Sequence, residues 1–323
     1  MVGDGSAGVA LVTQDAAMRR MLDVVRYVAA SDVTVLVGGE SGTGKALLAR
    51  HLHDQSPRHD GPFAAVHCAA LSRERLASAL FGHEPGAVPG ALTRVCGAFE
   101  LTHGGTLLLE EIGELDSALQ ARLLRVLRKR LIERVGSPDA VSVDVRIVAT
   151  TTRRLRPLVD AGRLCRELFD CVSVATVVVP PLRERRGDVA LVAAYVLEHL
   201  ESDRPLQLDE SAHELLRAHP WPGNVRELVQ ALERAAILAH GPVITAADLE
   251  DGAASPLRIG LGSLAGLTVR EVERRLIVDT LARTRNNRTQ AAKLLGISIR
   301  TLRNKLAEYR ARGECVLARE PML

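Results

Sequence analysis

Eight consecutive residues near the amino end have the types and spacing of a phosphate-binding loop. They follow an apolar run, Val33–Val37, and lead into a helical pattern, Leu47–Leu52. In such a loop, backbone N–H groups and a helix N-terminus concentrate partial positive charge, and glycines let phosphate oxygens come close. A lysine adds a full charge near the outer phosphates. The pattern predicts a nucleoside triphosphate ligand rather than an ordinary glycine-rich turn. The residues are Gly39, Glu40, Ser41, Gly42, Thr43, Gly44, Lys45 and Ala46.

A pair of carboxylates ends a second apolar run further along the chain. Glu110 and Glu111 follow Thr106–Leu109 directly. In nucleotide-hydrolysing sites of this kind, one carboxylate holds the Mg²⁺ shell and another orients the attacking water. We therefore assign Glu110 to the metal and Glu111 to catalysis. The pair alone is weak evidence, but its place downstream of a phosphate loop strengthens it.

Alternating apolar runs and helical patterns must position these groups. Helices are expected over Ala16–Ala30 and Leu119–Leu131, among others. This alternation predicts an α/β fold with a parallel sheet and helices on both faces, ending at Pro180. Residues 180–250 show helical patterns and no strand, which predicts a small all-α lid. The expected strands are Val33–Val37, Ala64–His67, Thr106–Leu109, Val143–Thr150 and Ser173–Val179.

The carboxyl-terminal part has the pattern of a helix-turn-helix. A short helix over Thr289–Leu295 and a turn at Gly296 precede a third helix that Ser298 caps. Such a helix enters the major groove of double-stranded DNA. A generic helical hairpin with a basic face is the alternative. The third helix is expected to bury Ile299, Leu302, Leu306 and Tyr309. The predicted DNA-binding residues are Arg300, Thr301, Arg303, Asn304 and Lys305.

The helix before this hairpin is expected over Val269–Ala282 and to mediate dimerisation, because such modules read two half-sites. Its apolar stripe comprises Val269, Val272, Leu276, Ile277, Thr280 and Leu281.

Charge and composition agree with this division. The chain of 323 residues has a net charge of +3, but Thr268–Leu323 has 13 Lys and Arg against 6 Asp and Glu. A basic end of this kind suggests a polyanionic partner. Five cysteines without a C-x-x-C spacing indicate neither disulfides nor a zinc site, and no secretory signal or membrane span is visible. We expect a cytoplasmic protein.

Ordered motifs along nearly the whole chain resemble one family, the bacterial enhancer-binding AAA+ activators of sigma-54 RNA polymerase. The wording of the last block is most similar to flagellar-gene regulators of that family. The resemblance implies an AAA+ P-loop NTPase domain, an all-α lid and a Fis-type helix-turn-helix. The matching blocks are GESGTGK (39–45), FAAVHCAAL (63–71), LFGHEPGA (80–87), GGTLLLEEIGEL (104–115), PPLRERRGDV (180–189), WPGNVREL (221–228) and NRTQAAKLLGISIRTLRNKLAEY (287–309).

The resemblance also implies an activity. Family members form ATP- and Mg²⁺-dependent rings, usually hexamers, that bind DNA upstream of promoters and remodel polymerase. Lys45 matches the phosphate-loop lysine, Glu111 the catalytic glutamate, and Arg226 the sensor arginine that reaches the γ-phosphate from the lid. Only about a dozen residues precede the ATPase pattern, so sensing in cis is not expected.

Several positions depart from the family pattern. Arginines that reach into the neighbouring subunit's site fall at two cysteines, and losing such an arginine costs roughly 10³–10⁵ in rate. Arg163 and Arg166 are nearby but on different helical faces. The departures are His67 for Asn, Glu110 for Asp, Thr152 for Asn, Ala46 for Glu, and Cys165 and Cys171 for Arg.

The loop that contacts sigma-54 departs as well. The family motif is Gly-Ala-Phe-Thr-Gly-Ala, and here the aromatic ring and the hydroxyl are both absent. Pro89 also fixes φ and removes a backbone donor. Contact with sigma-54 is therefore expected to be impaired. The loop consists of Gly86, Ala87, Val88, Pro89, Gly90 and Ala91.

Three functions fit these observations. The favoured one is a DNA-binding transcription regulator that binds ATP, self-associates as a dimer or up to a hexamer, and hydrolyses weakly or not at all. It would act as a repressor, with another polymerase form, or in mixed rings with an intact paralogue. The alternatives are an active ATPase that opens sigma-54 promoters and an AAA+ remodeller unrelated to transcription. The expected domains are a disordered tail 1–13, the α/β domain 14–179, the lid 180–250, a linker 251–267, the helix-turn-helix 268–312 and a tail 313–323.

Overall fold

The computed structural model divides the chain into two compact units, Met1–Ala254 and Ser255–Leu323. It describes residues 11–200, 205–239, 241–254, 273, 276–277, 280–281 and 287–311. The predicted linker beyond residue 254, the tail 313–323 and most of the helix over Val269–Ala282 lie outside the described residues. In the part of the chain that is described, no helix is long and apolar enough to cross a membrane.

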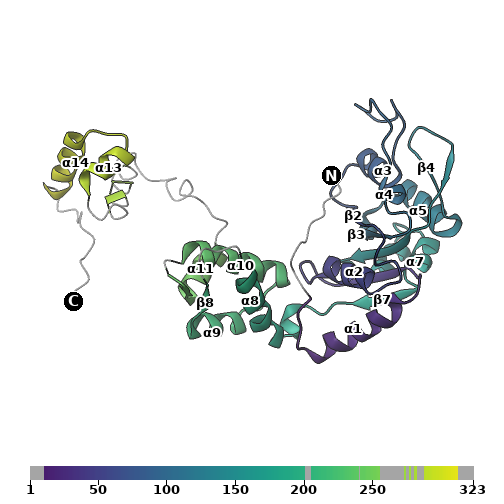
Figure 1. The fold of residues 1–323 in the computed structure, drawn as a ribbon, viewed down its shortest axis with the longest axis horizontal. Helices are drawn as coiled ribbons and strands as arrows, with labels where there is room; N and C mark the ends of the chain where they lie inside the picture. Colours follow the sequence, from purple (N-terminus) through teal and green to yellow (C-terminus); the bar gives the residue numbers. More distant parts are fainter. Residues whose placement is uncertain are drawn as a thin grey trace. The chain divides into compact units, whose positions relative to one another are not determined.

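The first unit is built on a parallel sheet of five strands in the order β2-β3-β6-β1-β7 (Figure 1). All five predicted strands are present, with ends shifted by no more than three residues. The last three residues of β6 register with the β1 residues that lead into the phosphate loop. The strands are β1 (Val35–Gly38), β2 (Phe63–His67), β3 (Thr106–Glu110), β6 (Arg146–Thr151) and β7 (Ala175–Val178).

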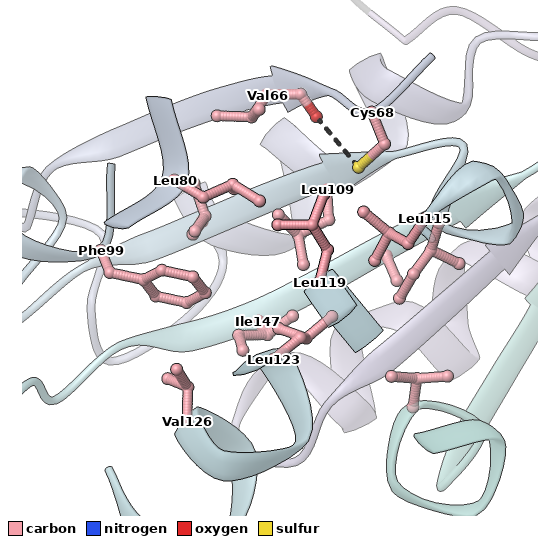
Figure 2. Packing of buried hydrophobic residues seen from close by; sticks show 14 of the residues in the cluster. Val66, Cys68, Leu80, Phe99, Leu109, Leu115, Leu119, Leu123, Val126 and Ile147 are labelled. Carbon is pink, nitrogen blue, oxygen red and sulfur yellow. Dashed lines mark hydrogen bonds between the residues drawn. The ribbon is translucent and has the colours of Figure 1, made fainter. Parts of the chain in front are cut away.

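Both faces of the sheet are covered, which explains why the central strands read as continuous apolar runs. Leu108 packs toward α1 and α2 on one face, whereas Leu107 and Leu109 pack toward α3, α4 and α5 on the other. Figure 2 shows this second face, where Leu109 and Ile147 meet Leu123. The helices are α1 (Ala16–Ala29), α2 (Lys45–Asp54), α3 (Arg73–Phe81), α4 (Ala98–Leu101), α5 (Ser117–Lys129), α6 (Leu155–Asp160) and α7 (Arg166–Val172).

Side-chain caps set the starts of the two predicted helices. The Asp15 carboxylate accepts from the N–H groups of Ala17 and Met18 at the start of α1, and Asp116 accepts from Leu119 at the start of α5. Such caps contribute about 1 kcal/mol each. Helix α5 ends at Lys129 rather than at Leu131, because Arg130 adopts a left-handed conformation with φ of 56°.

A hairpin follows that the sequence did not predict. β4 (Leu131–Glu133) pairs antiparallel with β5 (Ala140–Ser142). The pairing continues through a hydrogen bond from the Val143 N–H to the Arg130 carbonyl, at 2.9 Å. Val143 therefore belongs to the hairpin, and β6 begins at Arg146 rather than at the predicted Val143.

The lid is mainly helical but not entirely so. A two-residue parallel pair, β8 (Gln207–Leu208) with β9 (Val243–Ile244), contradicts the expectation of no strand. The last lid helix continues four residues past the predicted boundary at 250. The lid helices are α8 (Gly187–His199), α9 (Glu210–Ala218), α10 (Asn224–Leu238) and α11 (Ala246–Ala254).

Residues 11–13 are ordered, which corrects the predicted tail 1–13. Leu11 packs against the core that α1 and α2 form, and Val12 against the lid core. The Thr13 hydroxyl donates to the Asp188 carboxylate at 2.6 Å, and the Gln14 N–H donates to the same group at 2.7 Å. This segment therefore contacts both halves of the unit.

The second unit contains the predicted hairpin as α13 (Arg288–Leu294) and α14 (Ile299–Ala311). Ser298 caps α14 by accepting from the Thr301 N–H at 3.0 Å, as predicted. Gly296 has φ of 67°, which a glycine adopts without strain. One predicted core residue is wrong, since Ile299 is 36% exposed, whereas Leu276, in the stripe expected to mediate dimerisation, is 57% exposed in the single chain. The core is Ile277, Leu281, Ala291, Ala292, Leu302, Leu306 and Tyr309.

Candidate nucleotide and DNA sites

Three neighbouring strands bring the predicted nucleotide residues together at their carboxyl ends. β1 leads into the phosphate loop, β3 ends at Glu110, and β6 ends at Thr151. Ligands in parallel α/β sheets bind at this edge. Gly44 starts α2 with φ of 99°, a conformation that strains other residues, so the loop can turn sharply onto the helix N-terminus.

Lys45 is nearly buried within this loop. Its ammonium donates to the carbonyl oxygens of Gly39 and Glu40, both at 2.9 Å, and lies 3.8 Å from a Glu111 oxygen. Burial lowers the pKa of Lys45, and the Glu111 carboxylate opposes that shift. The charge is therefore held at the mouth of the loop, beside the predicted catalytic carboxylate.

Thr152 holds Glu111. The other carboxylate oxygen of Glu111 accepts from the Thr152 N–H at 2.9 Å and from the Thr152 hydroxyl at 2.8 Å. Glu111 itself has φ of 55°, in the left-handed region, where a non-glycine residue pays a conformational cost. The sequence identified Thr152 only as a departure from the family pattern, whereas here it orients the carboxylate.

His67 does not reach Glu111. Its backbone is in register with Glu110 across β2 and β3, but its Nδ1 accepts from the Ala69 N–H at 3.2 Å. Its imidazole makes a local turn contact. The described residues contain no group of three or more His, Cys, Asp and Glu that could hold a metal ion. A Mg²⁺ ion there would depend on Glu110, water and phosphate oxygens, a ligand set that suits this ion.

The lid closes over the other side of the phosphate loop. The guanidinium of Arg226, at the start of α10, donates to the Ser41 hydroxyl at 3.0 Å. A Cβ on Gly42 would lie 2.2 Å from the Gly223 carbonyl oxygen, so only glycine fits between loop and lid. The predicted sensor arginine therefore lies at the predicted loop.

Three further residues contact the loop, two of them in the connector between β7 and α8 (residues 179–186) and one in the lid. Sequence reasoning did not single them out. Asn224 donates to the Ser41 carbonyl, Arg183 pairs with Glu40, and Arg185 donates to the Thr43 carbonyl at 2.9 Å. They lie at least 140 residues from their partners, so no local pattern links them. Their presence in PPLRERRGDV and WPGNVREL was the only signal.

An apolar cleft adjoins the start of α2. It lies between the amino-terminal segment, α1, α2 and the lid helices α8 and α10, and Arg185 and Tyr195 contribute polar groups. It lies beside Thr43 and Gly44, where the phosphate loop meets α2. The sequence missed it because Leu11 and Val12 were assigned to a tail. Its apolar lining includes Leu11, Val12, Met18, Leu47, Val192, Val196, Val225 and Val229.

In the second unit, α14 presents four of the five predicted DNA-binding side chains to solvent. These are Arg300, Thr301, Arg303 and Asn304. The fifth, Lys305, is partly buried, and its ammonium lies 2.6 Å from the Glu273 carboxylate. Lys305 is therefore less available to a phosphate than the sequence suggested.

Comparisons with known proteins agree with this architecture. Residues 11–178 match the Sigma-54 interaction domain family, residues 183–256 the AAA+ ATPase lid domain, and residues 268–309 the bacterial regulatory proteins of the Fis family. The chain belongs to the sigma-54 interaction domain family.

Individual relatives share most of the chain. Transcriptional regulatory protein FlbD of Caulobacter vibrioides is 42% identical over 94% of this chain and 71% of its own length. Regulatory protein AtoC of Escherichia coli is 42% identical over 93% of this chain and 67% of its own. The structure of NtrX from Brucella abortus in complex with ATP superposes with a TM-score of 0.69, at 32% identity, over 92% of this chain and 68% of that one.

The loop that departs from the family motif is closed on itself. The Gly86 N–H donates to the Ala91 carbonyl at 2.8 Å, and the Ala91 N–H donates to the Val88 carbonyl at 3.0 Å. A Cβ on Gly136 of the β4–β5 hairpin would lie 2.5 Å from the Ala87 Cβ, so hairpin and loop pack closely.

Ion pairs fix the base of this loop. Arg134, only 8% exposed, lies 2.5 Å from the Glu100 carboxylate and 3.4 Å from that of Glu84, which lies two residues before the loop. Glu100 and Glu84 are also within 4.0 Å of Arg94, which follows the loop by three residues. The segment before the loop is therefore tied to the hairpin, and the segment after it is tied to Glu84 and to α4.

The two cysteines at the family's arginine positions lie on and before α7. Cys165 precedes the helix and is exposed, and Cys171 is partly buried. The guanidinium groups of Arg163 and Arg166 make no hydrogen bond or ion pair within the described part of the chain. Both side chains are exposed.

Proposed function

We propose that this chain is an ATP-binding transcription regulator that binds specific DNA sites and hydrolyses ATP slowly or not at all. Its family membership and its Fis-type helix-turn-helix support regulation through DNA. The phosphate loop, Lys45 and the lid residue Arg226 converge on one site, which supports nucleotide binding. The NtrX structure with bound ATP supports the same assignment by similarity.

One observation carries the proposal of slow turnover. The groups that would grip the phosphates within the chain are in place, whereas Cys165 and Cys171 stand where the family supplies arginines to a neighbouring subunit. A thiol cannot neutralise the charge that develops on a transferring phosphoryl group. Binding without efficient turnover follows from this division.

We also propose that contact with sigma-54 is weak, because the loop that would make it departs from the family motif. Val88 and Pro89 replace the aromatic and hydroxyl side chains of the family motif, and Pro89 has no N–H to donate. The segment just before the loop is also tied to the hairpin by the Glu84–Arg134 pair, and Glu100 of α4 pairs with the same arginine. The protein would then repress, act with another polymerase form, or join rings of an intact paralogue.

When bound, Mg²⁺ would supply charge neutralisation between the phosphates. Glu110 would hold it through a carboxylate oxygen, at the end of β3. Lys45 would donate to the outer phosphates, Arg226 would reach the last phosphate from the lid, and Glu111, oriented by Thr152, would accept a hydrogen bond from water.

An active ATPase is the second candidate, and the geometry of Glu111 favours it. The carboxylate is oriented by two hydrogen bonds and lies beside Lys45, which is the arrangement that hydrolysis requires. If neighbouring Arg163 or Arg166 replaces the missing arginines, turnover would survive.

One assay separates the two candidates. ATP binding and turnover are measured for the wild type, for Lys45→Ala and for the double variant Cys165→Arg/Cys171→Arg, each alone and mixed with a full-length relative. We expect Lys45-dependent binding, turnover near background, and a rise of about 10³-fold or more in the double variant, the lower end of the range that an arginine finger supplies. Robust wild-type turnover with open-complex formation on a sigma-54 promoter would refute the proposal.

A further inference from the structure

Asn224 connects the lid to the phosphate loop more directly than any other side chain in the described residues. It is fully buried at the first position of α10. Its Oδ1 accepts from the Leu182 N–H at 2.8 Å, and its Nδ2 donates to the Ser41 carbonyl at 2.9 Å and to a Glu40 carboxylate oxygen at 3.2 Å. One side chain thus joins the connector, the loop and the lid.

Both the backbone and the side chain of this position require asparagine. Its φ is 56°, in the left-handed region, which asparagine tolerates better than most residues. The amide supplies an acceptor and two donors at once, and no other side chain of this size does so. Alanine would leave the Leu182 N–H and the Ser41 carbonyl without this partner, which destabilises the contact because a buried polar group without a partner is unfavourable.

An ion pair reinforces the same contact. The Arg183 guanidinium donates to both oxygens of Glu40, each at 2.6 Å, in the planar fork that makes such pairs strong. These hydrogen bonds, followed by that from Asn224, lower the pKa of Glu40 to about 2. Glu40 is therefore charged at every physiological pH, and the pair does not switch off as pH varies.

Arg226 is placed by these contacts. It follows Asn224 by two residues on the first turn of α10, and its own N–H donates to the Gly42 carbonyl at 3.3 Å. Its guanidinium reaches the Ser41 hydroxyl, one residue from Glu40. If the first turn of α10 moves away from the loop, Arg226 moves with it.

We propose that Asn224 and the Glu40–Arg183 pair form a lid clamp that positions Arg226 at the phosphate loop. Asn224 is a positioning residue in this scheme, because it affects nucleotide binding through Arg226 and does not contact the nucleotide itself. The effect of the clamp on nucleotide binding rests on the proposed function, whereas the clamp contacts themselves are present in the protein without a ligand.

The nucleotide-free arm of the test measures the clamp directly. Hydrogen exchange at residues 39–44 and the emission of Trp221, the chain's only tryptophan, are compared in the wild type, Arg183→Ala and Asn224→Asp. Asn224→Asp keeps the shape, removes the donor and sets a second carboxylate against Glu40. We expect at least about tenfold faster exchange in both variants, as loss of a charged hydrogen bond predicts. The matched control is Arg186→Ala, an exposed arginine three residues from Arg183 that makes no side-chain contact with the loop.

Unchanged exchange in both variants would overturn the clamp, whether or not the protein binds ATP. A variant whose Trp221 emission matches that of the denatured chain has lost the lid fold and is replaced by Glu40→Gln, which weakens the same pair from the other side. The failure of ATP to bind the wild type would overturn the proposed function alone.

The nucleotide arm is a double-mutant cycle between Asn224→Asp and Arg226→Ala, read as the Kd of a fluorescent ATP analogue. Because Asn224 acts through Arg226, Asn224→Asp weakens binding about tenfold when Arg226 is present and by less than about twofold when it is absent. Additive losses would mean that Asn224 only stabilises the lid, and would overturn its role as a positioning residue.

Discussion

At the scale of single residues, the hydroxyl of Thr152 is the group that most directly governs the predicted catalytic carboxylate. It supplies one of two hydrogen bonds to Glu111, and the backbone N–H of the same residue supplies the other. Replacing the hydroxyl by a methyl group keeps the shape and leaves the backbone contact. Glu111 would then rotate more freely while the phosphate loop stays intact.

We therefore predict that Thr152→Val leaves the Kd for ATP within about twofold and slows single-turnover hydrolysis about tenfold, the equivalent of one hydrogen bond to a charged group. Quenched-flow or long-incubation assays with excess protein would measure even a slow wild-type rate. Thr176→Val, at an exposed threonine of the edge strand β7, is the control. Equal rates in Thr152→Val and the wild type would show that the Thr152 hydroxyl does not assist hydrolysis through Glu111.

At the scale of elements, α14 carries both exposed arginines and a lysine that is already paired with a carboxylate. Arg300 and Arg303 are exposed, whereas the Lys305 ammonium is paired with Glu273. A phosphate contact by Lys305 would have to compete with that carboxylate.

We predict that Arg300→Ala and Arg303→Ala each weaken DNA binding and lower the slope of log K against log salt by about one, while Lys305→Ala has a smaller effect. Binding of a promoter fragment measured by fluorescence anisotropy at several salt concentrations tests this. ATP binding should not change. Arg156→Ala, at an exposed arginine of α6, is the control, and a loss there as large as for Arg300 would place the DNA surface elsewhere.

At the scale of the whole molecule, one partly buried arginine joins three connections between elements of the α/β domain. Arg58, only 13% exposed, follows α2 and pairs with Asp32 after α1 and with Asp144 before β6, at 2.8 Å and 2.9 Å. Hydrogen bonds from Arg58 lower the pKa of both carboxyl groups. Their folded pKa values lie below the unfolded ones, so the stabilisation is full above about pH 4 and is lost as pH falls.

Arg58→Met should accordingly lower the free energy of unfolding by about 1 kcal/mol at pH 7, a modest figure because both carboxylates are more than half exposed. The difference from the wild type should shrink below pH 3, where the carboxylates are protonated in both proteins. Urea titrations at both pH values measure it. Arg26→Met, which breaks an exposed pair within α1, serves as control and should change stability little. A difference that does not depend on pH would assign the effect of Arg58 to packing.

How much the sequence predicted follows from the range of the interactions involved. The phosphate loop and the five strands were predicted because each is contiguous and its apolar run is buried on both faces. The β4–β5 hairpin was missed because its strands are three residues long and follow a helix that only Arg130 ends. The contacts of Glu40 with Arg183 and Asn224 span more than 140 residues, and no spacing reveals them.

The same reasoning explains the errors in the second unit. Ile299 fits an apolar helical stripe, but periodicity does not say where the stripe stops, and this side chain lies outside the buried core. Lys305 looked like its neighbours on the basic face. Only its pairing with Glu273, which the sequence pattern does not reveal, distinguishes Lys305 from those neighbours.

The short segment from Leu11 to Asp15 has a mechanical consequence. It is attached to the lid through Asp188 and to the α/β core through Leu11, and it borders the apolar cleft beside the phosphate loop. A force applied ahead of residue 11 would therefore act at the joint between lid and sheet before it reached either core. Tension there would first break the hydrogen bonds to Asp188 and withdraw Leu11, and so loosen the contact between lid and sheet.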